Sequence, residues 1–324
     1  MTSAARPAKW KIVLAFSIIY LVWGSTFLAI RIGVNEVPPF LLAALRFFVA
    51  GIAMYAWLRA TGTPSPSQRQ WFGSALLGGM IFVVDYGCLF WSEQRVPSGI
   101  AAVVLATIPV FITVLEIILL RTMRLSLGLA ISLLLGIAGV AILMSNSFSL
   151  GQAPIDHAGA AALLLASFTW SVATVITRRT PLPESKAMSS ATQMLCGGAQ
   201  LVVVSALAGE FSRFHPRTVS WSAWAALLYL IVAGSIIGFT AYVWLLHYES
   251  PTKVGTYAYV NPVIAVLLGY FFAGEALGAR TVLGTLLVLV SVIAITLKPK
   301  PASNRNVPTE RKFKEESVPE EINT

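Results

Sequence analysis

The chain has 324 residues, of which 56% are hydrophobic and 11% are charged, and its mean hydropathy is +0.76. Soluble domains carry about 25% charged residues, so this composition excludes a soluble globular enzyme. The formal net charge of +9 comes from short basic clusters between apolar runs, and no single basic face is visible. Nucleic acid is therefore not expected as a partner.

Apolar runs follow one another along the chain, each bounded by charges or by proline and glycine clusters. A membrane-spanning helix needs about 20 mainly apolar residues, so each run is long enough to be one span. We therefore expect an all-α polytopic membrane protein with ten transmembrane helices. The expected spans are 12–33, 39–59, 71–91, 98–120, 126–145, 157–177, 187–209, 220–246, 252–273 and 280–297.

The lysines and arginines are divided unevenly between alternate loops. More of them fall on the side of the N-terminus than on the opposite side, which places both termini in the cytoplasm. Residues 299–324 mix both charges with several prolines and few apolar residues. This composition predicts a disordered cytoplasmic tail.

The two halves of the chain resemble each other, which indicates an internal duplication. The expected repeats are residues 10–145 and 156–298, with five spans in each. Because five is odd, the second repeat enters the membrane from the opposite side, and inverted repeats of this kind are typical of secondary carriers. The matched residues are Trp23 with Trp170, Arg31 with Arg178, Trp91 with Trp244 and Pro109 with Pro262.

Four groups of short segments stand out along the chain: Trp23-Gly24-Ser25-Thr26-Phe27, Ala44-Leu45-Arg46-Phe47-Phe48, Val96-Pro97-Ser98-Gly99 with Ile108-Pro109, and Tyr257-Ala258-Tyr259-Val260-Asn261-Pro262 with Gly274-Glu275. In these segments the chain resembles the EamA-type carriers of the drug/metabolite transporter superfamily, and the resemblance covers about residues 10–298. It implies a carrier in the bacterial inner membrane that exports small metabolites, amino acids or drug-like compounds. One departure is that the second half has Gly274-Glu275 where the first has Arg121-Thr122, so no symmetric role is expected for Glu275.

Two opposite charges, Arg46 and Asp85, fall at a similar depth within the second and third spans. An ionisable group in hydrocarbon costs at least ~2.5 kcal/mol unless it is paired or faces water. The matching positions in the second half are the uncharged Gln193 and Gly238, as expected if the two charges neutralise each other. Two interpretations stay open: a buried ion pair that ties two helices together, or Asp85 as a proton or substrate-amine site released from Arg46.

Glu116 lies toward the inner end of the fourth span, shortly before Arg121 and Arg124. It is either a glutamate satisfied near the inner interface or a possible coupling carboxylate. Its depth is opposite to that of Asp85, which argues against shared chemistry between the two acids.

Pro109 and Pro262 fall near the middle of the fourth and ninth spans and are expected to act as hinges. Each proline frees a backbone carbonyl, and such carbonyls can face a polar cavity near the midplane. The alternatives are packing kinks and ordinary aromatic packing between helices. The residues expected around a substrate cavity are Trp23, Thr26, Asp85, Tyr86, Thr107, Trp170, Thr240, Tyr257, Tyr259 and Asn261.

The sequence contains no P-loop, no H-E-x-x-H or G-x-S-x-G pattern and no metal-ligand spacing, so no ATP-driven pump, cofactor or metal is expected. The favoured interpretation is a secondary-active carrier that works by alternating access, with a small-molecule substrate and the lipid bilayer as partners. An intramembrane enzyme and a passive channel are the alternatives. The substrate, the coupling ion and the oligomeric state are left open.

Overall fold

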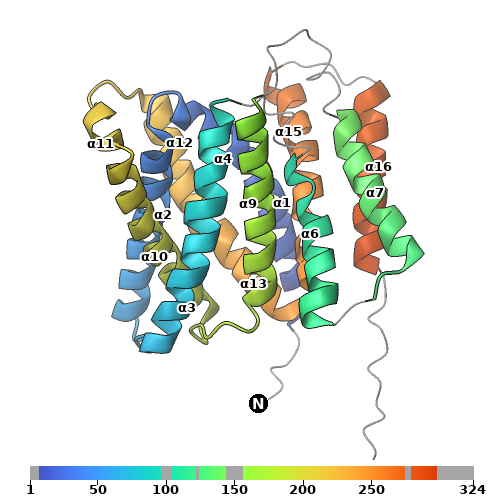
Figure 1. Cartoon of the computed structure of the whole chain (residues 1–324), viewed down its shortest axis with the longest axis horizontal. Coiled ribbons are helices and arrows are strands. Elements are labelled where there is room, and N and C mark those ends of the chain that lie inside the picture. The colour runs from blue at the N-terminus through green and yellow to red at the C-terminus, as the bar shows by residue number, and fades with distance from the viewer. Residues whose placement is uncertain (1–6, 96–103, 122–123, 144–155, 274–278, 298–324) are drawn as a thin grey trace, which may run out of the picture.

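The computed structural model describes residues 7–95, 104–121, 124–143, 156–273 and 279–297, and all structural statements below refer to these ranges (Figure 1). They contain helices and no strand, which confirms the all-α prediction. The Val96–Gly99 and Gly274-Glu275 segments and the predicted tail lie outside the described residues.

The first half of the chain forms long helices, one of which contains a π-helical segment in its middle. In chain order the elements are α1 (Lys9–Val34), α2 (Pro39–Ala60), α3 (Gln68–Gly78), the π-helix η1 (Gly79–Tyr86), α4 (Gly87–Glu93), α6 (Ile108–Leu115), the π-helix η2 (Glu116–Leu120) and α7 (Leu127–Leu143). The segments α3, η1 and α4 form one continuous helix.

The second half is built in a similar way and again contains a long helix with a π-helical middle, formed by α12, η3 and α13. The elements are α9 (His157–Ile176), α10 (Lys186–Leu207), the short α11 (Glu210–Arg213), α12 (Trp221–Tyr229), the π-helix η3 (Leu230–Phe239), α13 (Thr240–Tyr248), the short α14 (Pro251–Val254), α15 (Tyr257–Ala273) and α16 (Ala279–Leu297).

Six helices of the described chain are long and apolar enough to cross a membrane. They are Lys9–Val34, Pro39–Ala60, Gln68–Glu93, His157–Ile176, Lys186–Leu207 and Trp221–Tyr248. Shorter apolar helices span Ile108–Leu120, Leu127–Ile142 and Val282–Ile295. The chain is therefore a helical protein with several membrane-span candidates.

The two sides of α1 show how the bundle divides between protein and lipid. Ile19 and Trp23 are buried, whereas Leu14, Leu21 and Leu28 are 51%, 56% and 61% exposed. The exposed leucines recur every seven residues, so they lie on one side of the helix. A stripe of large apolar side chains that no other described helix covers is typical of a surface that faces lipid.

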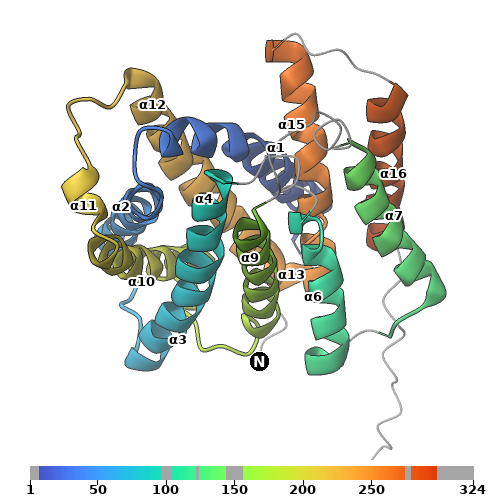
Figure 2. The same cartoon turned by 45° about the horizontal axis from the view of Figure 1, so that its top comes forward.

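The helices form two close pairs in which the partners come from different halves of the chain. In Figures 1 and 2, α2 lies beside α10 on the left and α7 lies beside α16 on the right. Glycine allows the first pair to approach closely: a Cβ atom on Gly51 would lie 2.4 Å from the backbone nitrogen of Leu195, and one on Gly198 would lie 2.4 Å from that of Phe48. Between the two pairs, α1 packs on α15 and α6 packs on α9.

The two predicted hinge prolines occupy different places in their helices. A turn at 106–107 precedes α6, so Pro109 lies in the first helical turn, where its missing N–H leaves no intrahelical bond unmade. Pro262 lies inside α15. The interruption near Pro109 is thus a break before the proline, and the mid-helix kink expected there is absent from this described segment.

Candidate functional site

A cavity lies among α1, η1, α9 and the start of α15, and five aromatic side chains form much of its wall. Its volume is about 60 Å³. Since one water needs roughly 10–15 Å³, a few waters fit, and a larger solute requires the surrounding helices to move apart. The cavity brings together these residues that were predicted from the sequence: Trp23, Thr26, Asp85, Tyr86, Trp170, Tyr257, Asn261 and the hinge residue Pro262.

The aromatic side chains of the cavity contact one another through their edges and faces. The ring centroid of Trp23 lies 5.6 Å from the ring centroid of Trp170 and 4.8 Å from that of Tyr257, and both contacts are T-shaped. The Tyr86 ring lies 5.9 Å from the Trp170 ring, also edge to face. Edge-to-face contacts of this kind stabilise aromatic clusters by about 0.5–1.5 kcal/mol each beyond burial.

The two tryptophans differ in their hydrogen bonding. Trp23 Nε1 donates to the carbonyl oxygen of Gly234 at 3.0 Å, and a Cβ atom on Gly238 would lie 2.6 Å from that nitrogen. Trp170 Nε1 is buried and has no hydrogen-bond partner in the described chain. The absence of a side chain at Gly238 therefore leaves Trp23 the room to make its bond.

Asp85 lies in η1 near the point where the π-helix meets α4, and it is only 4% exposed. It is the only acidic residue among the described residues that line the cavity, and no lysine, arginine or histidine accompanies it there. Within the described ranges its carboxylate forms no ion pair and no hydrogen bond. The cavity thus contains one buried, uncompensated carboxyl group.

The expected ion pair between Arg46 and Asp85 is not formed in this structure. Arg46 Nε donates to Ser235 Oγ at 2.9 Å, and the guanidinium carbon lies 4.6 Å from the ring centroid of Phe47 and 5.0 Å from that of Tyr86. Its two terminal nitrogens are buried without a hydrogen-bond partner in the described chain. The serine on η3 and the two rings hold the guanidinium, whereas Asp85 lines the cavity.

Leu105 and Ala258, which lie four residues before the two prolines, also line the cavity and were not among the residues predicted from the sequence. Pro262 lies inside α15 and has no N–H to donate to the carbonyl of Ala258, four residues earlier. The position four residues before each proline was the sequence signal that could have identified Leu105 and Ala258. Asn261 Oδ1 is another acceptor without a hydrogen-bond partner in the described part of the chain.

Three predicted cavity residues make contacts elsewhere. Thr107 Oγ1 donates to the Val104 carbonyl oxygen at 2.6 Å. Tyr259 donates from its hydroxyl to the Leu133 carbonyl oxygen on α7 at 3.1 Å. Thr240 faces Met54, with 3.7 Å between Oγ1 and Sδ, in a separate groove.

Glu116 lies away from the cavity and binds the start of the short helix α14. Its Oε2 atom accepts hydrogen bonds from the Thr252 backbone nitrogen at 3.0 Å and from Thr252 Oγ1 at 2.7 Å. A carboxylate at a helix N-terminus compensates backbone N–H groups that have no partner within the helix. These contacts support the structural interpretation of Glu116.

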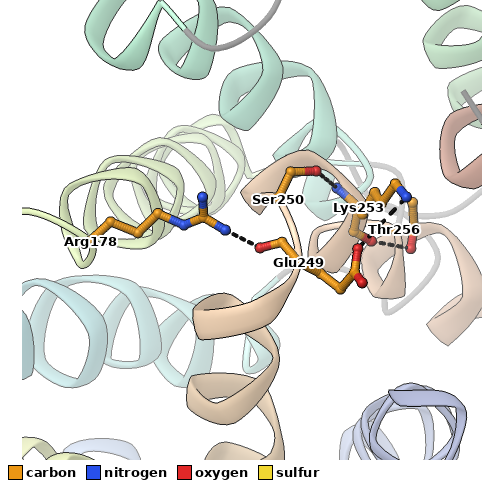
Figure 3. Close-up of polar contacts among 5 residues, drawn as sticks. All are labelled: Arg178, Glu249, Ser250, Lys253 and Thr256. Atoms are coloured by element: carbon orange, nitrogen blue, oxygen red, sulfur yellow. Dashed lines mark hydrogen bonds and ion pairs between the residues drawn. The ribbon is translucent and has the colours of Figure 1, made fainter. Parts of the chain in front are cut away.

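Polar contacts join helices of the second half at the predicted cytoplasmic end, as Figure 3 shows. Arg178, just after α9, donates from Nε to the Leu246 carbonyl oxygen at 3.1 Å and from Nη2 to the Glu249 carbonyl oxygen. Lys253 Nζ lies 3.7 Å from Glu249 Oε2, and Thr256 Oγ1 donates to the Lys253 carbonyl oxygen at 2.7 Å. This cluster ties the end of α9 to the turn between α13 and α14.

Carboxylates join the two halves at the opposite end of the bundle. Glu36 accepts hydrogen bonds from the backbone nitrogen and from Oγ of Ser220, both at 2.6 Å, and these bonds hold the pKa of the Glu36 carboxyl below its ordinary value. Glu210 Oε2 accepts from the Leu41 backbone nitrogen at 2.7 Å and from Ser205 Oγ at 2.9 Å. The cavity therefore lies between two sets of polar contacts.

Comparison with known proteins relates both halves of the chain to one family. The model of the EamA-like transporter family matches residues 10–145 and 157–297. The Escherichia coli (strain K12) protein named "Uncharacterized inner membrane transporter YedA" is 38% identical over 282 residues, which cover 86% of this chain and 88% of the relative. "Protein PecM" of Dickeya dadantii (strain 3937) is 26% identical over 276 residues, or 85% of this chain and 88% of the relative.

A solved crystal structure has the same fold. It superposes with a TM-score of 0.70, covers 90% of this chain and 98% of its own, and is 22% identical in sequence.

Proposed function

Because the chain belongs to the EamA-like transporter family of the drug/metabolite transporter superfamily, we propose that it is a secondary-active carrier in the membrane. It exports small metabolites, amino acids or drug-like compounds by alternating access. The observation that carries this proposal is the cavity described above, which is built from α1 and η1 of the first half and from α9 and α15 of the second.

We further propose ten transmembrane helices in two inverted repeats, residues 10–145 and 156–298. The helix pairing supports this arrangement. The pairs α2 with α10 and α7 with α16 each join an element to its counterpart, and the contact of α1 with α15 has its counterpart in that of α9 with α6. The π-helices η1 and η3 also occupy matching places in the third and eighth expected spans. A pseudo-two-fold axis through the cavity accounts for all of these pairings.

In this mechanism the two sets of polar contacts at the ends of the bundle separate in turn. Inward opening breaks the bonds from Arg178 to the α13–α14 turn, and outward opening breaks the contact between Glu36 and Ser220. Since the cavity holds about 60 Å³ in the described conformation, binding of a metabolite needs one of these movements.

The proposed setting is the bacterial inner membrane, with both termini and the tail 299–324 in the cytoplasm. The relative YedA is named an inner membrane transporter, and the charge distribution of this chain favours the same orientation for both termini.

An intramembrane enzyme and a passive channel both explain the arrangement of these residues less well than a carrier does. An intramembrane enzyme needs two catalytic groups that meet, but Asp85 lines the cavity whereas Glu116 is bonded to Thr252 outside it. A passive channel needs a continuous polar pore, but the cavity has a largely aromatic and apolar wall. We therefore propose neither enzymatic activity nor a channel.

Reconstitution into proteoliposomes tests the carrier. A panel of radiolabelled amino acids and aromatic metabolites is offered with and without an imposed pH gradient, and counterflow is measured. We expect saturable counterflow for wild type, loss of it in Trp170→Ala, and its retention in Trp221→Ala, a matched change at a tryptophan that is 89% exposed. Solute flux that never saturates and shows no counterflow would indicate a pore and would contradict the proposal.

A further inference from the structure

We propose that the cavity recognises a protonated amine attached to an apolar or aromatic group. This inference rests on the proposed carrier function and names its substrate class. Four features carry it: the isolated carboxylate of Asp85, the aromatic wall, the hydrogen-bond acceptors without partners, and the position of Arg46.

The charge of the cavity favours a cation. Asp85 is the only ionisable carboxylate on the described wall, and it forms neither an ion pair nor a hydrogen bond within the described chain. A buried charge is costly unless an opposite charge compensates it. A cationic ligand supplies that charge, whereas an anionic ligand adds a second negative charge at close range.

The aromatic wall favours the same ligand. The faces and edges of Trp23, Trp170 and Tyr257 meet around the cavity, with ring centroids 4.8–6.2 Å apart. Aromatic faces attract cations through the ring quadrupole, and indole is the strongest of them. The same rings bury an apolar group well, so they fit a ligand with an ammonium at one end and a hydrocarbon at the other.

The hydrogen-bonding groups match an ammonium group, which has three donors and no acceptor. Asn261 Oδ1 is buried and has no hydrogen-bond partner in the described chain. The Ala258 carbonyl loses its helical donor at Pro262, and both residues line the cavity. Together with Asp85, these oxygens can accept all three N–H bonds of a primary ammonium.

Arg46 does not compensate Asp85. Its Nε atom is bonded to Ser235, and its guanidinium lies over Phe47 and Tyr86. Arg46 is also absent from the cavity wall, so it cannot bind the carboxylate of an anionic ligand there. No basic side chain of the described residues compensates the Asp85 carboxylate, so a bound cationic ligand supplies the positive charge.

Equilibrium binding to the purified full-length protein tests the proposal with three nearly isosteric probes. These are radiolabelled 2-phenylethylamine, with 2-phenylethanol and 3-phenylpropanoate as neutral and anionic competitors. We expect the unlabelled amine to compete at least ~10-fold more strongly than either competitor, a difference of about 1.4 kcal/mol. Asp85→Asn should weaken amine binding at least ~10-fold, whereas Glu184→Gln, which removes an exposed loop carboxylate, should leave it unchanged.

Asp85→Glu keeps the charge and is the second variant; it should bind the amine better than Asp85→Asn does. Each sample is checked for monodispersity before binding. No amine binding by wild type, equal competition by the alcohol, or equal amine affinity in Asp85→Asn would overturn the inference.

Counterflow separates the two proposals. Saturable counterflow of neutral solutes without any preference for the amine would contradict the proposed amine site and support the carrier. Amine binding that depends on Asp85, without counterflow of any compound, would support the amine site and contradict the proposed carrier.

Discussion

Trp23 and Trp170 meet edge to face with their ring centroids 5.6 Å apart, although they occupy matching positions in the two halves of the sequence. Among the described residues, the indole N–H of Trp23 has a partner, the carbonyl oxygen of Gly234, and that of Trp170 has none. The matching residues in the third and eighth expected spans also differ: Gly238 leaves room beside Trp23 Nε1, and its counterpart in the first half is Asp85. Two related halves thus build an asymmetric site.

This asymmetry predicts different effects for two identical substitutions. Trp23→Phe removes a buried hydrogen bond, whereas Trp170→Phe removes a donor that has no partner in the described chain. Both remove the same atoms, so the cavity cost is similar, and Trp23→Phe should be more destabilising by about 1 kcal/mol. Unfolding of both variants in mixed micelles with increasing detergent measures the difference. Equal losses would contradict the hydrogen-bond assignment.

The separation of Arg46 from Asp85 predicts that the two residues contribute independently to stability. In a double-mutant cycle with Arg46→Met and Asp85→Asn, the coupling energy should be below ~0.5 kcal/mol, because residues that share no contact give nearly additive effects. The free energies of unfolding of wild type, both single variants and the double variant give this value. A coupling above ~1 kcal/mol would show that the ion pair does form.

The contact between α2 and α10 predicts that Gly51 cannot accept a larger residue. The added methyl group of Gly51→Ala would lie 2.4 Å from a backbone atom of Leu195, so the helices must move apart, and we expect a loss of roughly 1–3 kcal/mol. Gly87→Ala is the matched control, because its methyl group would lie 3.4 Å from the nearest atom, on the Phe40 ring. The unfolding free energy of Gly87→Ala should be unchanged or higher, since alanine favours helix.

Glu116 should be needed for structure and not for coupling. In Glu116→Gln the remaining carbonyl oxygen can still accept both hydrogen bonds from Thr252, so counterflow and its response to a pH gradient should persist. Glu116→Ala leaves the Thr252 N–H and hydroxyl without this acceptor and should cost about 1–3 kcal/mol. If Glu116→Gln abolishes the response to the pH gradient while it keeps wild-type stability, the coupling interpretation is correct instead.

The bonds from Ser220 predict a pH-dependent contribution from Glu36. They lower the pKa of the folded carboxyl, so its stabilising effect is present above the unfolded pKa of about 4.3 and disappears as the pH falls through the folded pKa. The difference in Tm between wild type and Glu36→Gln should therefore be larger near neutral pH than at about pH 3. Glu184→Gln is the control, because this exposed carboxylate accepts no hydrogen bond within the described part of the chain. A constant difference for Glu36→Gln would refute the prediction.

Much of the architecture could be predicted from the sequence, because the bilayer allows few solutions. A long apolar run in lipid must satisfy its own backbone hydrogen bonds, so it forms a helix. The rare tryptophans Trp23 and Trp170 and the prolines Pro109 and Pro262 then pointed to related halves and to residues that gather around one cavity.

The tertiary structure decided which side chains meet. Sequence depth placed Arg46 and Asp85 at one level, but depth does not specify rotation about the helix axis, and the π-helix η1 changes that rotation near Asp85. Ser235 and the rings of Phe47 and Tyr86 hold the arginine, and the carboxylate is left facing the cavity. The apolar pattern of the sequence determined the helices, whereas the contacts between helices determined where the uncompensated charge lies. The partners of a buried side chain depend on packing between segments that are far apart in the chain, and the sequence pattern does not specify that packing.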